Sequence, residues 1–287
     1  MSNYFDAFSI AQYNGQFCRL ITNRAALTQE MAKNTAAYYP YQLHESERPD
    51  TLSFMYYNDP SMEWLLFFAN EIIDPYYQWY LNDEQMYEMM ISKYGSLSNA
   101  QQKTRHFEVS WVNDSSTKTV SEYALLPSVA PTNLKQYWAP VLDDNGSIVY
   151  YARKRMEMTV ATNKIIQIDL DRSDDYVVGE IVYQTSGNAA TASAEVELVG
   201  DGYLIVKHVY GTFQLAALIG QDSGVSHTVT GSTVLVQNIP ASEETYWIGV
   251  SFYDYELALN EQRKSLRIID RNYTDVARSN LKNLMGT

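Results

Sequence analysis

The sequence of 287 residues is poor in cysteine, in basic side chains and in long apolar runs. Because Cys18 is its one cysteine, an intramolecular disulfide and a cysteine-rich metal cluster are excluded, and we expect Cys18 to be a small buried apolar residue. The N-terminus lacks the basic start and apolar run of a signal peptide. The apolar run from Trp64 to Ala69 is much shorter than the about 18 residues that a membrane helix needs. We therefore expect no membrane contact and a protein made in a reducing cytoplasm.

Basic residues number 21 against 34 acidic ones, which gives a net charge of −13. This balance argues against a general nucleic-acid binder, because phosphate contacts need clustered lysine and arginine. Residues 256–287 differ: six basic and four acidic side chains give that end +2 and leave −15 for the rest. This charge asymmetry has two interpretations. The basic C-terminal residues could attract an acidic partner, or they could form a solvated helix face.

Motifs for cofactors and catalysis are missing as well. The sequence has no phosphate loop, dinucleotide fingerprint or His-Glu-x-x-His pattern, so we predict no cofactor, no catalytic residue and no enzymatic activity. Carboxylates are plentiful, but no two of them stand out as a glycosidase pair.

One acidic segment partly fits a calcium-loop template. Its candidate ligands occupy template positions 1, 3, 5, 7 and 12, but position 6, which needs glycine for a sharp turn, is Asp174. Strand-like sequence on both sides favours an acidic turn between two strands, so we predict no metal site. The candidate ligands are Asp169, Asp171, Ser173, Asp175 and Glu180.

The segment around Ser223, QDSGVSH, is similar to the Asp-Ser-Gly near a serine-protease nucleophile. A protease also needs a histidine base and an orienting acid, and the four histidines are scattered along the chain. Asp-Ser-Gly is also a common hairpin turn, which is the interpretation that we favour.

Glycine is concentrated in residues 161–240, which hold 8 of the 13 glycines, no tryptophan or methionine, and 4 of the 24 tyrosines. Strand-like runs separated by turn residues every 8–12 positions predict a small all-β barrel or sandwich inserted into the chain. Residues 111–160 are polar, with no clear period over their first part, and we expect an extended connector there.

The flanking regions alternate between strand-like and helical patterns. A strand, YPYQLH, precedes two helical segments, DTLSFMYYN and SMEWLLFFANEI. A third helix should be capped by Asp83, should end at Gly95 and should bury Met86, Met89, Met90 and Tyr94 on one face. The chain closes with a predicted strand, SLRIID, and a helix from about Asn272.

The order strand, helix, helix is similar to the LysM fold, a small βααβ unit. The fuller set of motifs resembles the baseplate wedge protein 53 family of T4-like contractile-tailed phages over residues 3–110 and 246–287. The motifs are YFDAFSIAQYNG, CRLITNRAAL, YQLHESERPDTLSFMYYNDPSMEWLLFFANEIIDPYYQWYL, MMISKYG and YDYELALNEQRKSLRIIDRNYTDVARSNLKNLM.

The resemblance implies a non-enzymatic virion protein of the tail baseplate, made in the host cytoplasm. It also implies contacts with other wedge subunits and with neighbouring copies in a six-fold ring around the hub. We therefore predict an α+β chain with five parts: an N-terminal arm, a LysM-like domain, a connector, an inserted β module and a C-terminal docking strand and helix. Their expected bounds are 1–36, 37–110, 111–160, 161–240 and 241–287.

Aromatic residues are dense between Ser46 and Leu81. Trp64, Phe67, Phe68 and Ile72 have the spacing of an inner core face. The remaining aromatics exceed what a small core can absorb, so they are either extra core or partner contacts. The partner-contact candidates, with the apolar stripe of the last helix, are Tyr56, Tyr57, Tyr76, Tyr77, Trp79, Tyr80, Tyr273, Val276, Leu281 and Leu284. The alternative function is a LysM-type module that binds carbohydrate, namely peptidoglycan.

Overall fold

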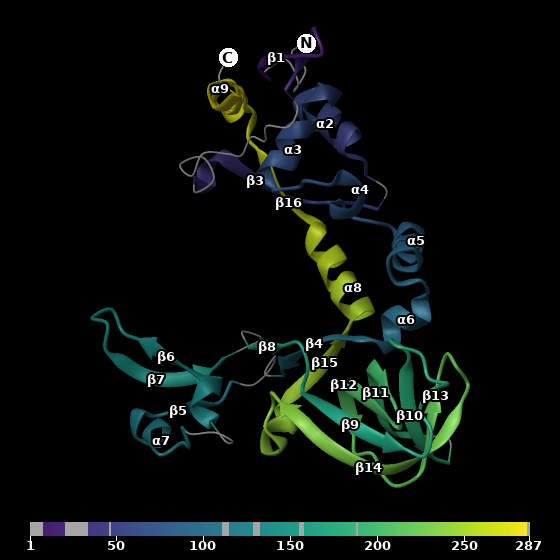
Figure 1. Cartoon of the computed structure of the whole chain (residues 1–287). Helices are drawn as coiled ribbons and strands as arrows, with labels where there is room; N and C mark the ends of the chain where they lie inside the picture. Colours follow the sequence, from purple (N-terminus) through teal and green to yellow (C-terminus); the bar gives the residue numbers. More distant parts are fainter. Residues whose placement is uncertain are drawn as a thin grey trace. The chain divides into compact units, whose positions relative to one another are not determined.

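The computed structural model describes residues 8–20, 34–45, 47–110, 115–128, 133–154, 158–187 and 189–285 (Figure 1). The chain forms two compact units. Unit 1 comprises Met1–Gly95 and Glu256–Thr287, and unit 2 comprises Ser96–Tyr255. Helices and strands are mixed throughout, which confirms the α+β class. Within the described ranges no helix is both long and apolar enough to cross a bilayer.

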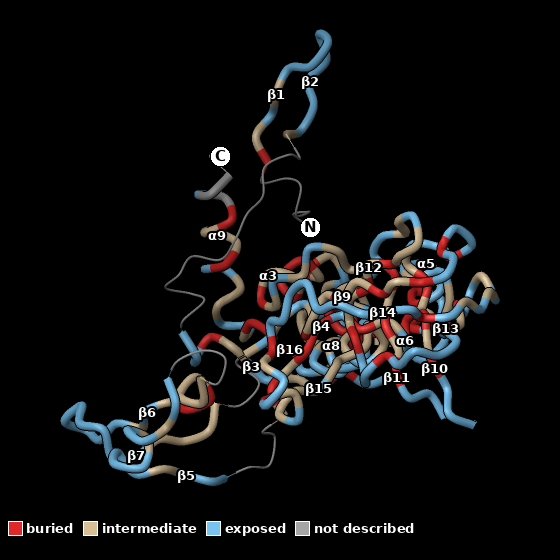
Figure 2. The backbone as a smooth tube through the Cα atoms, turned by 60° about the horizontal axis from the view of Figure 1, so that its bottom comes forward, coloured by how far each residue is buried: buried red, intermediate tan, exposed pale blue. Residues whose placement is uncertain are grey.

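Unit 1 begins with a hairpin of β1 (Ile10–Tyr13) and β2 (Gln16–Arg19). Asn14 and Gly15 both have positive φ, as a two-residue hairpin turn requires. Most of the hairpin is exposed, as the pale blue tube in Figure 2 shows. Cys18 lies on β2 and is exposed, so the expectation of a buried cysteine was wrong. A two-stranded hairpin has no interior in which to bury a side chain.

The two-stranded sheet of unit 1 pairs β3 (Tyr38–Gln42) with β16 (Ser265–Ile269) in antiparallel register. Between them in the chain come α2 (Pro49–Tyr57) and α3 (Glu63–Ala69), the latter preceded by a short 3-10 turn, η3 (Pro60–Met62). The predicted strand, helix and helix are confirmed. The strand that completes the sheet comes from the far end of the chain, and the LysM-like assignment stays a prediction.

Local signals explain where these helices begin and end. In α2, Pro49 occupies the first turn, where its missing N–H costs nothing, and Asn58 ends the helix in the left-handed region. In α5 (Asp83–Tyr94) the N-cap is Asn82 rather than the predicted Asp83, because Asn82 and Gln85 form a reciprocal capping box. Gly95 caps the C-terminus of α5, as predicted. Met86, Met89 and Met90 are buried, also as predicted.

The C-terminal segment is folded onto unit 1. A 3-10 turn, η6 (Arg271–Tyr273), leads into α9 (Thr274–Met285). The helix buries Ala277 and Leu281 in a core with Phe8, Met62, Trp64, Leu65, Ala69 and Ile269. A second core combines Leu43, Leu52, Leu66, Trp79, Tyr80, Leu266 and Ile268. The predicted core residues Trp64, Phe67, Phe68 and Ile72 all pack in one of these two cores.

Unit 2 contains a closed antiparallel barrel in the order β10-β11-β12-β9-β14-β13. Its core is aliphatic, with Ile168, Val182, Leu204, Val206 and Leu218 almost fully buried. The predicted small barrel is therefore confirmed, and it is not a sandwich. Its strands are β9 (Lys164–Leu170), β10 (Ile181–Ser186), β11 (Ala189–Gly200), β12 (Tyr203–Gly211), β13 (Ala217–Gly220) and β14 (Ser226–Gln237).

Residues expected to form an extended connector are folded in the described parts. They supply a three-stranded sheet in the order β5-β7-β6. Tyr137 and Trp138 are buried there in a small core with Val109. The aromatic side chains of this segment need a core, which an extended path cannot give. The elements are β5 (Thr117–Lys118), α7 (Val120–Ala124), η4 (Leu134–Tyr137), β6 (Trp138–Leu142) and β7 (Ile148–Arg153).

The rest of unit 2 is a sheet in the order β15-β4-β8 with two short helical segments. Its strands are β4 (Thr104–Val109), β8 (Thr159–Val160) and β15 (Trp247–Ser251), and the helical segments are α6 (Leu97–Gln102) and η5 (Ala241–Tyr246). Helix α8 (Phe252–Arg263), which the sequence analysis did not predict, carries the chain from unit 2 back into unit 1.

Candidate docking surface

Three of the predicted contact residues are buried in unit 1. Trp79, Tyr80 and Leu281 belong to its two cores. The indole Nε1 of Trp79 donates to the carbonyl of Glu47 at 2.8 Å, which fixes the ring inward. These three side chains therefore stabilise the fold, and we omit them from the candidate surface.

Three more are partly buried and packed against the same cores: Tyr56, Tyr57 and Tyr273. The hydroxyl of Tyr57 donates to the carbonyl of Ile269 at 2.8 Å, and burial raises the pKa of Tyr57. The guanidinium of Arg271 lies over the ring of Tyr56, 5.1 Å from its centroid. These tyrosines chiefly connect α2 to the C-terminal segment.

Tyr76, Tyr77 and Val276 are exposed. The exposed fraction is 84% for Tyr76, 55% for Tyr77 and 49% for Val276. The side chain of Leu284 lies outside the described residues. Of the predicted contacts, Tyr76 and Tyr77 thus offer the largest free aromatic surface.

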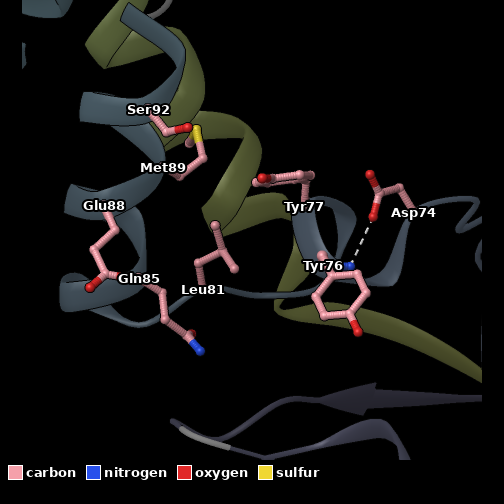
Figure 3. A pocket seen from close by; sticks show the side chains of 8 residues that line it. All are labelled: Asp74, Tyr76, Tyr77, Leu81, Gln85, Glu88, Met89 and Ser92. Atoms are coloured by element: carbon pink, nitrogen blue, oxygen red, sulfur yellow. Dashed lines mark hydrogen bonds between the residues drawn. The ribbon is translucent and has the colours of Figure 1, made fainter. Parts of the chain in front are cut away.

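The two tyrosines line a pocket of about 450 Å³ between α4 (Pro75–Gln78) and α5 (Figure 3). The side chain of Tyr77 extends from α4 toward α5 (Figure 3). The α5 side chains follow helical spacing, so they share one face of that helix. The lining residues are Asp74, Tyr76, Tyr77, Leu81, Gln85, Glu88, Met89 and Ser92.

Helix α4, which forms one side of the pocket, is stabilised by hydrogen bonds from backbone N–H groups to the side chains of Asp74 and Gln78. Oδ1 of Asp74 accepts from the backbone N–H of Tyr76 at 3.0 Å (Figure 3). Oε1 of Gln78 accepts from the backbone N–H groups of Ile73 and Asp74 at 2.6 and 2.9 Å. These bonds fix the backbone at the start of the turn that carries Tyr76 and Tyr77.

Helix α5, which forms the other side of the pocket, is hydrogen-bonded to α8 through the buried carboxylate of Glu256. Oε1 of Glu256 accepts from Nζ of Lys93 at 2.6 Å and from the hydroxyl of Tyr94 at 2.8 Å. Burial raises the pKa of Glu256, but the hydrogen bonds from Lys93 and Tyr94 outweigh it and leave the pKa lowered. Asn260, one turn further along α8, pairs through its side-chain amide with the backbone N–H and carbonyl of Leu81 at 2.9 and 2.8 Å.

The pocket lies in a strongly acidic stretch of the chain. Residues 71–92 hold five acidic side chains and no lysine, arginine or histidine, which gives a local charge of −5. Exposed aromatics with such a charge favour a partner that presents apolar and cationic groups. The sequence analysis selected Tyr76 and Tyr77 but missed the carboxylates. The one local signal for the α5 wall was the helical spacing of Gln85, Glu88, Met89 and Ser92.

The acidic segment weighed as a calcium loop is a turn between β9 and β10. Glu180 is buried, and its two carboxylate oxygens accept from the backbone N–H groups of Val177, Asp222 and Ser223. Oδ1 of Asp171 accepts from the N–H of Thr228 at 2.9 Å. Within the ranges that the structure describes, no three His, Cys, Asp or Glu side chains are grouped to hold a metal ion.

The Asp-Ser-Gly segment is also a turn. The hydroxyl of Ser223 donates to the carboxylate of Glu180, at 2.9 Å to Oε2, so it points to an acid and not to a histidine. The side chain serves to satisfy a buried carboxylate at the end of the barrel.

Exposed tyrosines beside a pocket lined by carboxylates make this surface a candidate site for contacts with other proteins. Residues 23–121 match the family model described as Base plate wedge protein 53. Over 61 residues it is 34% identical to the baseplate wedge protein gp53 of Enterobacteria phage T4. That alignment covers 21% of this chain and 31% of the phage T4 protein.

The family match includes the pocket and the unit 1 elements from β3 to α5, and it extends into unit 2 as far as Ser121. It ends before the barrel strands begin at Lys164, and the assignment of the barrel as an inserted module stays a prediction. The resemblance at residues 246–287 lies outside the matched range and stays a prediction.

Proposed function

We propose that this chain is a structural protein of the phage tail baseplate that joins neighbouring wedges through protein–protein contacts. Its partners are other wedge subunits and neighbouring copies in a six-fold ring around the hub, within the virion. It acts without catalysis and without a cofactor. The observation that carries the proposal is the family match over residues 23–121, which contains the exposed tyrosines of the pocket.

The pocket supplies the physical basis for such contacts. Interface hot spots are enriched in tyrosine, and truncating one costs about 2 kcal/mol or more of binding free energy. The caps of Asp74 and Gln78 order the α4 turn in the free protein. Less conformational entropy is then lost on binding.

The test is incorporation of a Tyr76→Ala, Tyr77→Ala double variant into tail particles. Both side chains are exposed, so the free chain should keep its helix signal and its thermal midpoint. We expect incorporation at limiting chain concentration to fall at least tenfold. Tyr87→Ala is the matched control, because Tyr87 is a similarly exposed tyrosine on α5 that does not line the pocket. Normal incorporation of the folded double variant would contradict the proposed surface.

A LysM-type carbohydrate-binding module is the second candidate, since β3, α2, α3 and β16 supply two strands and two helices. The loop after β3 disfavours it. The carboxylate of Glu47 accepts from the hydroxyl of Tyr41 and from the N–H of His44, so this charged group is used internally. Retention of the purified chain on peptidoglycan would favour the carbohydrate function.

A further inference from the structure

The second half of β14 has one free edge. On one side the strand pairs with β9 as far as Gln237. On the other side β13 pairs with Ser226, His227 and Thr228 and goes no further. In the part of the chain that the structure describes, Thr230–Gln237 has no strand partner on that second side. Alternate residues of a strand turn their N–H and C=O groups toward each edge, so this edge presents an unused row of backbone donors and acceptors.

The side chains of this edge are unusual for a free strand. The segment TGSTVLVQ contains no charge and no proline, two of the features with which proteins protect an exposed edge. Val234, Leu235 and Val236 are exposed by 52%, 48% and 44%. Two register shifts, at Val229/Gly231 and Val234/Val236, interrupt the pairing of the strand with β9.

The barrel does not require these residues for its own core. The barrel core includes Val229 at the start of the edge but no residue from Thr230 to Gln237. An apolar run that the fold leaves outside its core is therefore available to a partner.

We propose that the edge Thr230–Gln237 binds an extended, uncharged and apolar segment of another protein, which adds to the barrel as an antiparallel or parallel strand. The unpaired N–H and C=O groups of this edge can pair only with an extended backbone. The exposed valine and leucine side chains pack best against apolar side chains of that segment. The barrel lies outside the residues that match the family, so this inference goes beyond the proposed function.

A second copy of the chain is a poor occupant of the edge. Antiparallel self-pairing about the centre of the segment would set Leu235 opposite Ser232 and Val236 opposite Gly231. Two copies with a net charge of −13 each would also repel one another.

The experiment uses the full chain and a fluorescein-labelled peptide of six alternating threonine and valine residues between two serines. Fluorescence anisotropy measures binding. A second peptide has the same side chains but carries N-methyl groups on every backbone nitrogen of the six central residues, which removes the donors on both of its edges. The chain variants are Leu235→Lys on the edge and, as the control, Val178→Lys in the exposed β9–β10 turn. Both replaced side chains are exposed, and circular dichroism verifies that both variants fold.

We expect saturable binding of the plain peptide, weakened at least tenfold by N-methylation and at least tenfold by Leu235→Lys, and unchanged by Val178→Lys. Absence of saturable binding, or equal binding of the N-methylated peptide, would overturn strand addition. Sedimentation gives the remaining outcome: a wild-type dimer that Leu235→Lys dissociates would show that a second copy occupies the edge, and would overturn the proposed partner.

Discussion

At the scale of single residues, the hydroxyl of Tyr137 connects two buried groups in unit 2. It donates to the carboxylate of Glu243, which is fully buried, and it accepts from the indole N–H of Trp247 at 2.9 Å. Burial and the bond to Glu243 raise the pKa of Tyr137, so the group stays a donor. Gln136 supplies one further bond to the same carboxylate oxygen, at 3.1 Å.

Tyr137→Phe should therefore destabilise unit 2 by about 1–3 kcal/mol, because it leaves a buried carboxylate and an indole N–H without this partner. Urea unfolding followed by tryptophan fluorescence measures the change. Tyr150→Phe, at a more exposed tyrosine of β7, should change the unfolding free energy by less than about 0.5 kcal/mol. Equal effects of the two variants would show that the Tyr137 hydroxyl is not a structural bond.

The group of Lys93, Tyr94 and Glu256 predicts a pH dependence for unit 1. The pKa of Glu256 is lowered from its ordinary value of 4.5 in the folded chain, so its stabilising effect is present above pH 4.5 and is lost as the pH falls below it. The pKa of Lys93 is raised from 10.5, chiefly by its hydrogen bond to Glu256, so its effect is present below pH 10.5 and is lost above it.

Glu256→Gln should therefore lower the urea midpoint of unit 1 at pH 7. The difference from the wild type should shrink as the pH falls from 4.5 to 3, because the wild-type carboxylate becomes neutral. Glu84→Gln on the exposed side of α5 serves as control and should follow the wild type throughout. A difference for Glu256→Gln that stays constant from pH 7 to pH 3 would contradict the assigned ion pair.

At the scale of elements, β16 and α9 form a docking segment that binds within its own unit. β16 completes the sheet with β3, and α9 packs through Ala277 and Leu281 against the core around Trp64. Helix α9 is 12 residues long, which is marginal for an isolated helix in water. Its stability must come from this packing.

Leu281→Ala should lower the free energy of unfolding of unit 1 by about 2–5 kcal/mol through loss of apolar burial and the remaining cavity. Val276→Ala, on the exposed side of the same helix, should cost less than about 1 kcal/mol. Chemical unfolding followed by circular dichroism at 222 nm provides both values. A cost for Val276→Ala as large as that for Leu281→Ala would mean that the helix packs on its other face.

Sequence patterns predicted the elements whose signals are local. Helices α2, α3 and α5 have apolar spacing with proline, asparagine or glycine at their ends, and the glycine-rich strands predicted the barrel. Helix α8 was missed because its buried positions are Glu256 and Asn260, which carry no apolar periodicity. The strands in residues 115–154 were missed because they are short, mostly exposed and interrupted by proline.

The division between core and surface aromatics could not be predicted, because it depends on partners far along the chain. The indole N–H of Trp79 donates a hydrogen bond to the carbonyl of Glu47, which lies 32 residues earlier in the chain, and this bond holds the ring in the core. Tyr57 is held by Ile269, 212 residues away. Tyr76 and Tyr77 lie between Tyr57 and Trp79 in the sequence. Among the described residues their side chains have no comparable distant hydrogen-bond partner, and they stay exposed.

At the scale of the whole molecule, the chain combines a unit that contains most of the family match with a barrel that the match does not reach. Unit 1 presents the acidic aromatic pocket, and unit 2 presents the open edge of β14. The two surfaces differ in chemistry, since one carries tyrosines and carboxylates and the other carries backbone groups and aliphatic side chains. We infer that each unit binds its own kind of partner, so substitutions in the pocket should leave the barrel edge functional.

The most direct test of the central claim is an electron-microscopy map of an assembled tail that contains this chain. The account predicts density for the chain in the baseplate, with Tyr76 and Tyr77 buried against a neighbouring subunit and a cationic or apolar side chain of that subunit in the pocket. A map in which the chain lies outside the baseplate, or in which both tyrosines face solvent in every copy, would contradict it.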